Sequence, residues 1–262
     1  MLIAKDIHKT FFPGSVNEKR ALQGVSLTLE EGDFCTVIGS NGAGKSTFLN
    51  SIAGAFPIDK GSIEIDGVDV TRMPEHLRAK YIGRVFQDPM KGTAAAMQIS
   101  ENLAMASRRG QRQGLSWSSK ADQNAKFREL LKELDLGLEE RMTAHVGLLS
   151  GGQRQALTLL MATLVRPHLL LLDEHTAALD PKTAAKVLDI TEKIVSQQKL
   201  TTIMITHNMR DALRYGNRLV MMHNGRIVVD IRDEEKKNRT VPDLLALFEQ
   251  GAGEVSDAMM LS

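Results

Sequence analysis

The segment Gly39–Thr47, with the sequence GSNGAGKST, is the feature that most constrains the fold of this chain. The apolar residues Phe34–Ile38 before it are typical of a buried parallel strand, and residues 47–52 after it continue as a helix. A strand, a glycine-rich loop and a helix in this order predict an α/β domain whose loop wraps a phosphate group. A glycine-rich turn without a ligand is the alternative, and the complete pattern G-x-x-x-x-G-K-[ST] in this setting disfavours it.

Each residue type in this loop meets a demand of triphosphate binding. Glycines at positions 39, 42 and 44 let the backbone turn tightly and bring its N–H groups against phosphate oxygens. Lys45 can reach the β- and γ-phosphates as a point charge, and the Ser46 hydroxyl can bind Mg²⁺. We therefore predict a site for ATP with Mg²⁺. Its phosphate-binding residues are Gly39, Ser40, Asn41, Gly42, Ala43, Gly44, Lys45, Ser46 and Thr47.

The composition of the 262 residues argues against several other classes of protein. Hydrophobic residues make up 42% of the chain, which is enough for one α/β domain with a sizeable core. A net charge of +1 gives no support for binding duplex DNA or an anionic membrane through bulk charge. The single cysteine, Cys35, falls in the expected buried strand, and the histidines lack zinc-ligand spacing. No apolar run approaches the ~20 residues that span a bilayer, so we expect a cytosolic chain that reaches a membrane only through a partner.

The rest of the chain divides into a β-rich first part, a helical middle part and a final part in which helices and strands alternate. Asp66-Gly67 between two alternating runs predicts a β-hairpin. The polar, basic segment 108–114 is a solvated loop by default, and a contact with phosphate or a partner is the alternative. One apolar helix face is expected from Phe127, Leu130, Leu131 and Leu134. A short amphipathic segment near the C-terminus contains Leu244, Leu245, Leu247 and Phe248.

A second candidate for phosphate chemistry is the acidic pair Asp173-Glu174, which follows the aliphatic run Leu169–Leu172. The C-terminal ends of parallel strands are where α/β sheets bind ligands. Asp173 can help to hold Mg²⁺, and Glu174 can act as the general base that polarises the attacking water. Without the phosphate loop, a purely structural role for this acidic pair in a turn would be an equally well supported interpretation. The presence of that loop favours the catalytic interpretation.

A third motif reads Leu149-Ser150-Gly151-Gly152-Gln153 and precedes a helical run. Ser150 is a good N-cap, and the two glycines leave backbone N–H groups open to an anion. With this motif the chain resembles the ATP-binding-cassette (ABC) family of ATPases, whose signature sequence it carries. The resemblance extends from about residue 2 to residue 230, and the motifs follow the order of that family.

The resemblance implies roles for further residues. Phe11 matches the aromatic residue that stacks on adenine, with Phe12 as the alternative register, and Gln87 matches the glutamine that senses Mg²⁺ and the attacking water. Asp180 ends the loop that crosses the dimer interface, and His207 matches the histidine that contacts the γ-phosphate. Ser150, Gly151, Gly152 and Gln153 are expected to bind the ATP of a second copy.

Two positions depart from the family pattern. His175 stands where proline is usual, and Asn208 stands where aspartate is common. Neither position supplies a reacting group, so these departures bear on the rate of hydrolysis more than on its mechanism.

The resemblance implies an α/β P-loop NTPase fold with a RecA-like core, an antiparallel β subdomain and an inserted helical subdomain. We expect the ATPase core at residues 1–93 and 151–235, the helical subdomain at 94–150 and a short tail at 236–262. Two copies are expected to pair head to tail, so that each ATP lies between the phosphate loop of one copy and the signature motif of the other. Binding of ATP would then drive closure of the dimer.

The leading hypothesis for function is the ATPase subunit of a bacterial ABC transporter. The segment 92–103 and the basic loop after it resemble ATPases of amino-acid uptake, which work with a membrane permease and an extracytoplasmic substrate-binding protein. Residues 90–101 would line the groove that receives the permease, at the cytoplasmic face of the membrane. The alternatives are an exporter subunit and a soluble mechanical ATPase acting on nucleic acid or ribosomes. No nucleic-acid partner is expected, because the chain carries one cassette and a net charge near zero.

Overall fold

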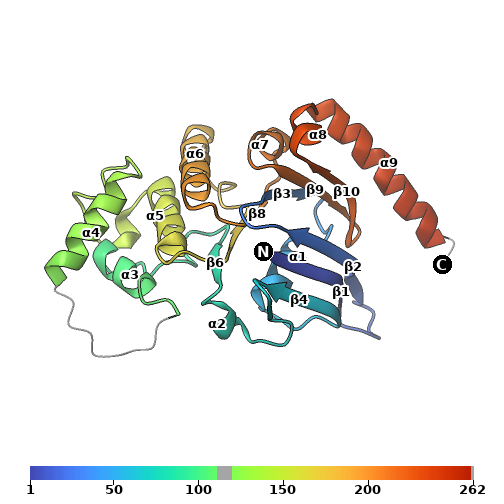
Figure 1. Ribbon diagram of the computed structural model, residues 1–262, viewed down its shortest axis with the longest axis horizontal. Coiled ribbons are helices and arrows are strands. Elements are labelled where there is room, and N and C mark those ends of the chain that lie inside the picture. Colours follow the sequence, from blue (N-terminus) through green and yellow to red (C-terminus); the bar gives the residue numbers. More distant parts are fainter. Residues whose placement is uncertain (111–119, 261–262) are drawn as a thin grey trace. The chain divides into compact units, whose positions relative to one another are not determined.

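The computed structural model describes residues 1–110 and 120–260 and divides into two compact units (Figure 1). The first unit consists of Met1–Arg78 and Lys199–Ser262, and the second of Ala79–Gln198. The expected helical subdomain 94–150 lies within the second unit, and its predicted boundaries remain predictions.

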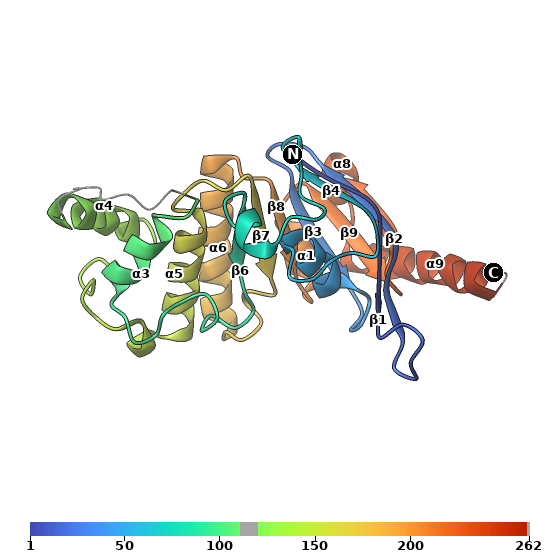
Figure 2. The same cartoon turned by 90° about the horizontal axis from the view of Figure 1, so that it is seen from below.

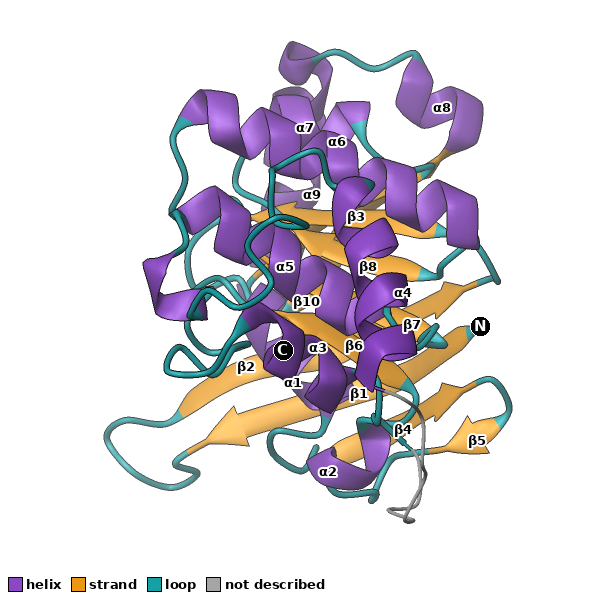
Figure 3. Cartoon of the chain, turned by 90° about the vertical axis from the view of Figure 1, so that its left-hand side faces the viewer, coloured by secondary structure: helices purple, strands orange, loops and turns teal. Residues whose placement is uncertain are grey.

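An antiparallel sheet occupies the N-terminal part of the first unit, with its strands in the order β2-β1-β4-β5 (Figures 2 and 3). In β2 the buried side chains of Val25, Leu27 and Leu29 alternate with polar ones, as a half-buried strand requires. Asp66 and Gly67 join β4 to β5 with positive φ angles of 47° and 77°, which confirms the predicted hairpin. The strands are β1 (Leu2–Phe11), β2 (Lys19–Leu29), β4 (Lys60–Ile65) and β5 (Val68–Asp69), and the short helix α2 (Glu75–Arg78) follows them.

A second group of strands in this unit, in the order β10-β9-β3-β8, carries the phosphate loop. Strand β3 (Phe34–Gly39) pairs in parallel with both β8 (Thr202–Ile205) and β9 (Arg218–His223). Residues 34–38 are all buried, which confirms the predicted core strand, and Cys35 is a buried core residue whose pKa burial raises to about 12. Strand β10 (Arg226–Arg232) is antiparallel to β9.

The C-terminal segment forms helices that pack on this unit. Helix α9 (Val241–Met260) runs beside β10 in Figure 1, after α7 (Met209–Arg214) and α8 (Asp233–Lys237). Leu244 is completely buried in a cluster with strand residues, Leu247 and Phe248 pack against that cluster, and Leu245 is 45% exposed. Leu244, Leu247 and Phe248 of the predicted amphipathic segment therefore lie on the inner face of a long helix, and Leu245 lies on its exposed side.

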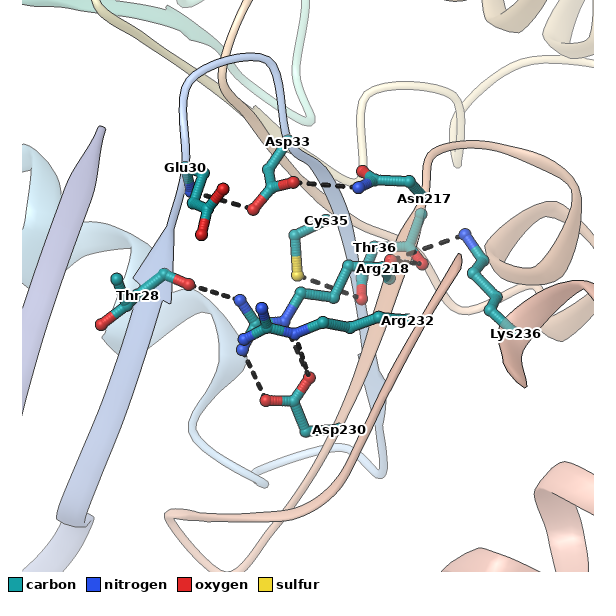
Figure 4. Close-up of polar contacts among 10 residues, drawn as sticks. All are labelled: Thr28, Glu30, Asp33, Cys35, Thr36, Asn217, Arg218, Asp230, Arg232 and Lys236. Atoms are coloured by element: carbon teal, nitrogen blue, oxygen red, sulfur yellow. Dashed lines mark hydrogen bonds and ion pairs between the residues drawn. The ribbon is translucent and has the colours of Figure 1, made fainter. Parts of the chain in front are cut away.

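Arg218 is the centre of a polar network that joins the strands of this unit (Figure 4). Its guanidinium group contacts both carboxylate oxygens of Asp230, at 2.7 and 2.5 Å, and donates to the carbonyl oxygen of Thr28. Lys236 on α8 donates to the carbonyl oxygens of Tyr215 and Gly216, and burial lowers its pKa to about 8. The network therefore links β2, β9, β10 and α8 through buried charge.

Replacing Asp230 with asparagine is expected to destabilise this unit. The side chain of Arg218 is only 3% exposed, so it would keep its charge but lose a charged, two-point acceptor. Hydrogen bonds to charged groups contribute roughly 1.5–3 kcal/mol, and we expect a loss of unfolding free energy in that range. Thermal unfolding measures it. Glu234→Gln, which removes an exposed ion pair with Lys237, is the control and should change stability by less than about 1 kcal/mol.

In its described residues, the second unit contains a parallel strand pair, four α-helices and a 3₁₀ turn. Strands β6 (Ile82–Val85) and β7 (Leu169–Asp173) pair in parallel. Of the predicted apolar face, Phe127, Leu131 and Leu134 are buried and Leu130 is half-buried. Leu134 lies beyond the end of its helix at Lys132. The helices are α3 (Ile99–Ala106), α4 (Lys120–Lys132), the 3₁₀ turn Val146–Leu148, α5 (Gly151–Thr163) and α6 (Pro181–Gln198).

The basic segment 108–114 is described only as far as residue 110, and residues 111–114 lie outside the described part of the chain. Arg109 does not extend into solvent as a solvated loop would predict. Its guanidinium donates to the carbonyl oxygens of Ala162, at 2.7 Å, and Val165, and burial lowers its pKa. Arg109 therefore binds carbonyl groups at the C-terminal end of α5.

Candidate functional site

The phosphate loop connects the end of β3 to helix α1 (Lys45–Ala53), and its glycines are required by the backbone. Gly39 and Gly44 have φ angles of 150° and 101°. A Cβ atom at Gly39 would lie 2.2 Å from the carbonyl oxygen of Met222, and one at Gly44 would lie 2.6 Å from that of Ala21. Side chains at these positions would force the loop open, so the sequence pattern fixes the loop shape.

Helix α1 presents its N-terminus to this loop. No side chain caps the helix start, and the first turn contains no acidic residue that would compete with a bound anion. The positive end of the helix and the N–H groups of the loop therefore favour a phosphate group. Lys45 is only 5% exposed, and its Nζ donates to the carbonyl oxygens of Gly39 and Ser40, at 2.8 and 3.1 Å. The loop backbone therefore holds this ammonium group beside its own N–H groups. A positive charge next to backbone donors fits the triphosphate of ATP.

The predicted adenine-binding aromatic residue lies next to the phosphate loop. Phe11 is the last residue of β1 and pairs with Lys19 of β2, whose Nζ lies 3.7 Å from the Cβ position of Gly42. Phe11 packs edge-to-face on Phe56 with 5.2 Å between ring centroids, whereas Phe12 is 68% exposed. Which of the two rings would stack on adenine stays a prediction. Lys19 adds a positive charge beside the loop that no sequence motif marks.

His207 follows β8 in the same unit and is exposed. Its neighbour Asn208 is the N-cap of α7, with the side chain accepting from the backbone N–H groups of Arg210 and Asp211. Asparagine and aspartate are about equally good N-caps. The departure at position 208 therefore preserves the local structure that follows His207.

The acidic pair lies at the end of β7 in the second unit. Asp173 is the last residue of the strand, and its Oδ2 lies 3.9 Å from Nη2 of Arg84 on the neighbouring strand β6. Glu174 leaves the strand with a positive φ of 48°, a conformation that costs a non-glycine residue about 1–2 kcal/mol. The next residue, His175, is 2% exposed, and burial lowers its pKa to about 4, so its ring is neutral.

The signature motif forms the start of helix α5. The Ser150 hydroxyl accepts from the N–H of Gln153, and the Gln153 side chain accepts from the N–H of Ser150. This capping box fixes the helix start and confirms the predicted N-cap. A Cβ atom at Gly151 would lie 3.1 Å from Leu179. The signature motif and the loop that contains Asp180 therefore lie side by side in this unit.

Gly152 packs even more closely on the helix that follows the acidic pair. A Cβ atom at Gly152 would lie 2.1 Å from Cγ2 of Thr183, in the first turn of α6. Asp180 caps that helix by accepting from the N–H of Thr183 at 3.1 Å, and hydrogen bonds to Thr183 lower the pKa of Asp180. Thr183 is thus a residue that the sequence analysis did not identify.

Gly152→Ala is expected to lower ATP hydrolysis by about 10- to 100-fold, because overpacking costs typically 1–3 kcal/mol and would displace the signature segment. Thr183→Ala removes the clashing methyl group, and the double variant should therefore recover most of the activity. Thr183→Ala alone is the control. Steady-state ATPase assays measure all three, and a double variant as inactive as Gly152→Ala would show that the added methyl group acts elsewhere.

Gln87 is exposed in the turn after β6. The residue before it is tied to the signature helix, since Nε2 of Gln155 donates to the carbonyl oxygen of Phe86 at 3.3 Å. The second unit thus contains Gln87, the signature motif, Asp173, Glu174 and Asp180, and the first unit contains Phe11, the phosphate loop and His207.

The predicted Mg²⁺ ligands are Ser46, Gln87 and Asp173, which offer a hydroxyl, an amide and a carboxylate oxygen. Within residues 1–110 and 120–260, no group of three or more His, Cys, Asp or Glu side chains is arranged to hold a metal ion. Mg²⁺ bound with a nucleotide takes one or two protein oxygen ligands, and phosphates and water supply the rest. The three oxygen donors are each of a chemical type that fits Mg²⁺. Which one or two of them bind the ion stays a prediction.

No helix in the described part of the chain is long and apolar enough to cross a membrane.

Comparison with known proteins gives consistent matches. A family model described as "ABC transporter" matches residues 22–177. The tyrosine transport ATP-binding protein of Clostridioides difficile (strain R20291) is 43% identical over 250 residues, which cover 95% of this chain and 99% of that protein. The thiamine import ATP-binding protein of Escherichia coli (strain K12) is 36% identical, over 77% of this chain and 82% of that protein.

The fold has solved counterparts as well. A dimeric, post-hydrolysis structure of the ATP-binding cassette MJ0796, bound to ADP and Pi, matches with a TM-score of 0.74 at 27% identity, covering 88% of this chain and 98% of that one. The predicted α/β P-loop NTPase fold is thereby confirmed. Because the family model matches more than half of the chain and a relative matches nearly all of it, the chain belongs to the ABC transporter family, as an ATP-binding and ATP-hydrolysing subunit.

Proposed function

We propose that the chain energises the import of an amino acid or a related small solute through a separate membrane permease. One observation supports this proposal above the others: the match to the tyrosine transport ATP-binding protein spans 95% of this chain. The match to the thiamine import protein is weaker in identity and spans 77%. The amino-acid class is therefore the better-supported substrate class.

The residues of the site support a head-to-tail dimer as the working form. In this proposal the phosphate loop and Lys45 of one copy bind the triphosphate, with Mg²⁺ held by Ser46, Gln87 and Asp173. Ser150–Gln153 of the second copy complete the site at the γ-phosphate. The capping box leaves the N–H groups of Gly151 and Gly152 at a helix start, where a phosphate group is favoured.

The catalytic roles follow from chemistry and position. Glu174, after the end of β7, accepts a proton from the attacking water, and His207 contacts the γ-phosphate. Mg²⁺ supplies charge stabilisation at the phosphate oxygens. Asp180 caps α6 next to the signature motif, and this position supports its assignment to the loop that faces the second copy.

The proposed partners are a permease that receives the chain at the cytoplasmic face of the membrane and an extracytoplasmic substrate-binding protein. The docking surface of the ATPase lies in residues 90–101 of the second unit. Met90 is 45% exposed there, and the nearby Leu148 is 70% exposed. Arg154 contacts the sulfur of Met90 and donates to the carbonyl oxygens of Gly147 and Leu149, the residues on either side of Leu148, at 3.1 and 3.2 Å.

Purification of the tagged chain from membranes of its native host, followed by reconstitution into vesicles, tests this function. We expect an integral membrane protein to copurify, and we expect ATP-dependent uptake of labelled tyrosine or another amino acid. Lys45→Ala chains in the same vesicles serve as the control without ATP-driven transport. Uptake of thiamine alone, outward movement of the solute, or recovery with ribosomes or DNA and no membrane protein would each contradict the proposal.

A further inference from the structure

The backbone of Glu174 has a left-handed conformation that the residues around it must maintain. Its φ angle is 48°, which a residue with a side chain adopts only when the surrounding structure holds it there. Its carbonyl oxygen accepts from the N–H of Ala177 at 3.0 Å, which closes a turn between β7 and α6. The direction of the Glu174 carboxylate therefore depends on what fixes this turn.

The side chain of His175, the residue after Glu174, connects this turn to helix α6. His175 is 2% exposed, and its Nε2 lies 3.1 Å from Oγ1 of Thr191, which is 1% exposed. The Thr191 hydroxyl donates its only proton to the carbonyl oxygen of Val187 at 2.8 Å. Oγ1 must therefore accept from His175, so Nε2 of the imidazole carries the proton.

The anchor point lies well inside the helix. Thr191 is eleventh in α6 (Pro181–Gln198), and its neighbours Val187 and Ile190 are buried. A buried position within a long helix moves little, whereas the end of a turn is easily displaced. The hydrogen bond therefore connects the residue after Glu174 to a rigid part of the same unit.

We infer that His175 is a positioning residue for ATP hydrolysis, and that its hydrogen bond to Thr191 holds the Glu174 backbone in the conformation that aims the carboxylate at the attacking water. This inference rests on the proposed role of Glu174 as general base. His175 acts through the backbone and does not touch the nucleotide. A small rotation at Glu174 would move the carboxylate by a distance that matters for proton transfer, because a general base must lie within hydrogen-bond reach.

Thr191→Val is the first test, since valine keeps the shape of the side chain and removes the hydroxyl group. We expect the kcat of the full chain to fall roughly fivefold, as expected for the loss of one hydrogen bond, while the Kd for ATP stays unchanged. Thr163→Val is the matched control. Thr163 is 2% exposed, and its hydroxyl donates to Leu159 at 2.9 Å within α5, without a histidine partner. The Thr163→Val variant should lose about as much thermal stability as Thr191→Val but keep the wild-type kcat.

Substitutions at position 175 extend the test. His175→Leu removes the donor and should lower kcat as Thr191→Val does, and the double variant should be no slower than His175→Leu alone. His175→Gln places an N–H group at about the same reach and should restore kcat to within about twofold of wild type. Additive losses in the double variant, or equal kcat values for Thr191→Val and Thr163→Val, would overturn the inference.

Glu174→Gln, measured in parallel, separates this inference from the proposed function. If Glu174→Gln keeps near wild-type turnover, Glu174 is not the base and the proposed catalytic role fails. If Glu174→Gln is inactive while Thr191→Val has the wild-type kcat, the catalytic role stands and the positioning role of His175 fails.

Discussion

Replacing Glu174 with glutamine is expected to lower ATP turnover by roughly 10²–10⁴-fold, the range that a general base contributes, while ATP still binds. Glutamine has nearly the shape of glutamate but cannot take a proton from water. The side chain follows β7 directly, and its backbone conformation is retained because the change is isosteric. The chemical step should therefore fail after a normal binding step.

The measurement for Glu174→Gln combines single-turnover hydrolysis, ATP binding and size-exclusion chromatography with and without ATP. In the proposed cycle ATP binding closes the dimer and hydrolysis opens it, so the variant should accumulate as an ATP-bound dimer. Glu192→Gln, on the exposed side of α6, is the control and should behave as wild type. Near wild-type hydrolysis by Glu174→Gln would show that another group accepts the proton.

Lys45→Ala is expected to weaken ATP binding about 10²-fold or more. Hydrogen bonds to charged groups are worth roughly 1.5–3 kcal/mol each, and the ammonium group is proposed to contact two phosphates. The side chain is almost fully buried, so water cannot replace its charge at low cost. The loss should be larger for ATP than for ADP, since the γ-phosphate adds a contact.

Isothermal titration with ATP and ADP in Mg²⁺ measures this effect. Lys60→Ala is the matched control in the same unit, because Lys60 is 71% exposed and its ion pair with Asp6 lies at the surface. An unchanged Kd for ATP in Lys45→Ala would contradict the assigned binding mode. Thermal unfolding must accompany the titration, because Lys45 also binds the carbonyl oxygens of Gly39 and Ser40.

Local features of the fold were predictable because local physics determines them. The run Phe34–Ile38 is buried as expected, and the hairpin at Asp66-Gly67 follows from backbone conformations that few residues adopt. The N-cap at Ser150 likewise follows from the first residues of its own helix. For the hairpin and the N-cap the determining contacts lie within a few residues along the chain. The burial of Phe34–Ile38 was predictable from its apolar pattern, although its partner strands β8 and β9 are distant in sequence.

Features that depend on distant residues could not be predicted. Arg109 was expected in a solvated loop, yet it binds carbonyl groups more than fifty residues away, at 162 and 165. The contact of Gly152 with Thr183 and the hydrogen bond of His175 with Thr191 also join separate elements. The departure at His175 was visible in the sequence, but its partner was not, because helical spacing alone does not show which strand end faces Thr191.

A complementation assay tests the central claim, that two copies build each ATP site head to tail. Chains with Lys45→Ala and chains with Gly152→Ala are each expected to be nearly inactive, because every site in either homodimer has a defective half. A mixed dimer has one site that combines the intact phosphate loop of the Gly152→Ala chain with the intact signature motif of the Lys45→Ala chain. We predict that mixing the two inactive proteins restores ATP hydrolysis well above either alone. Mixtures no more active than the separate variants would contradict the head-to-tail site.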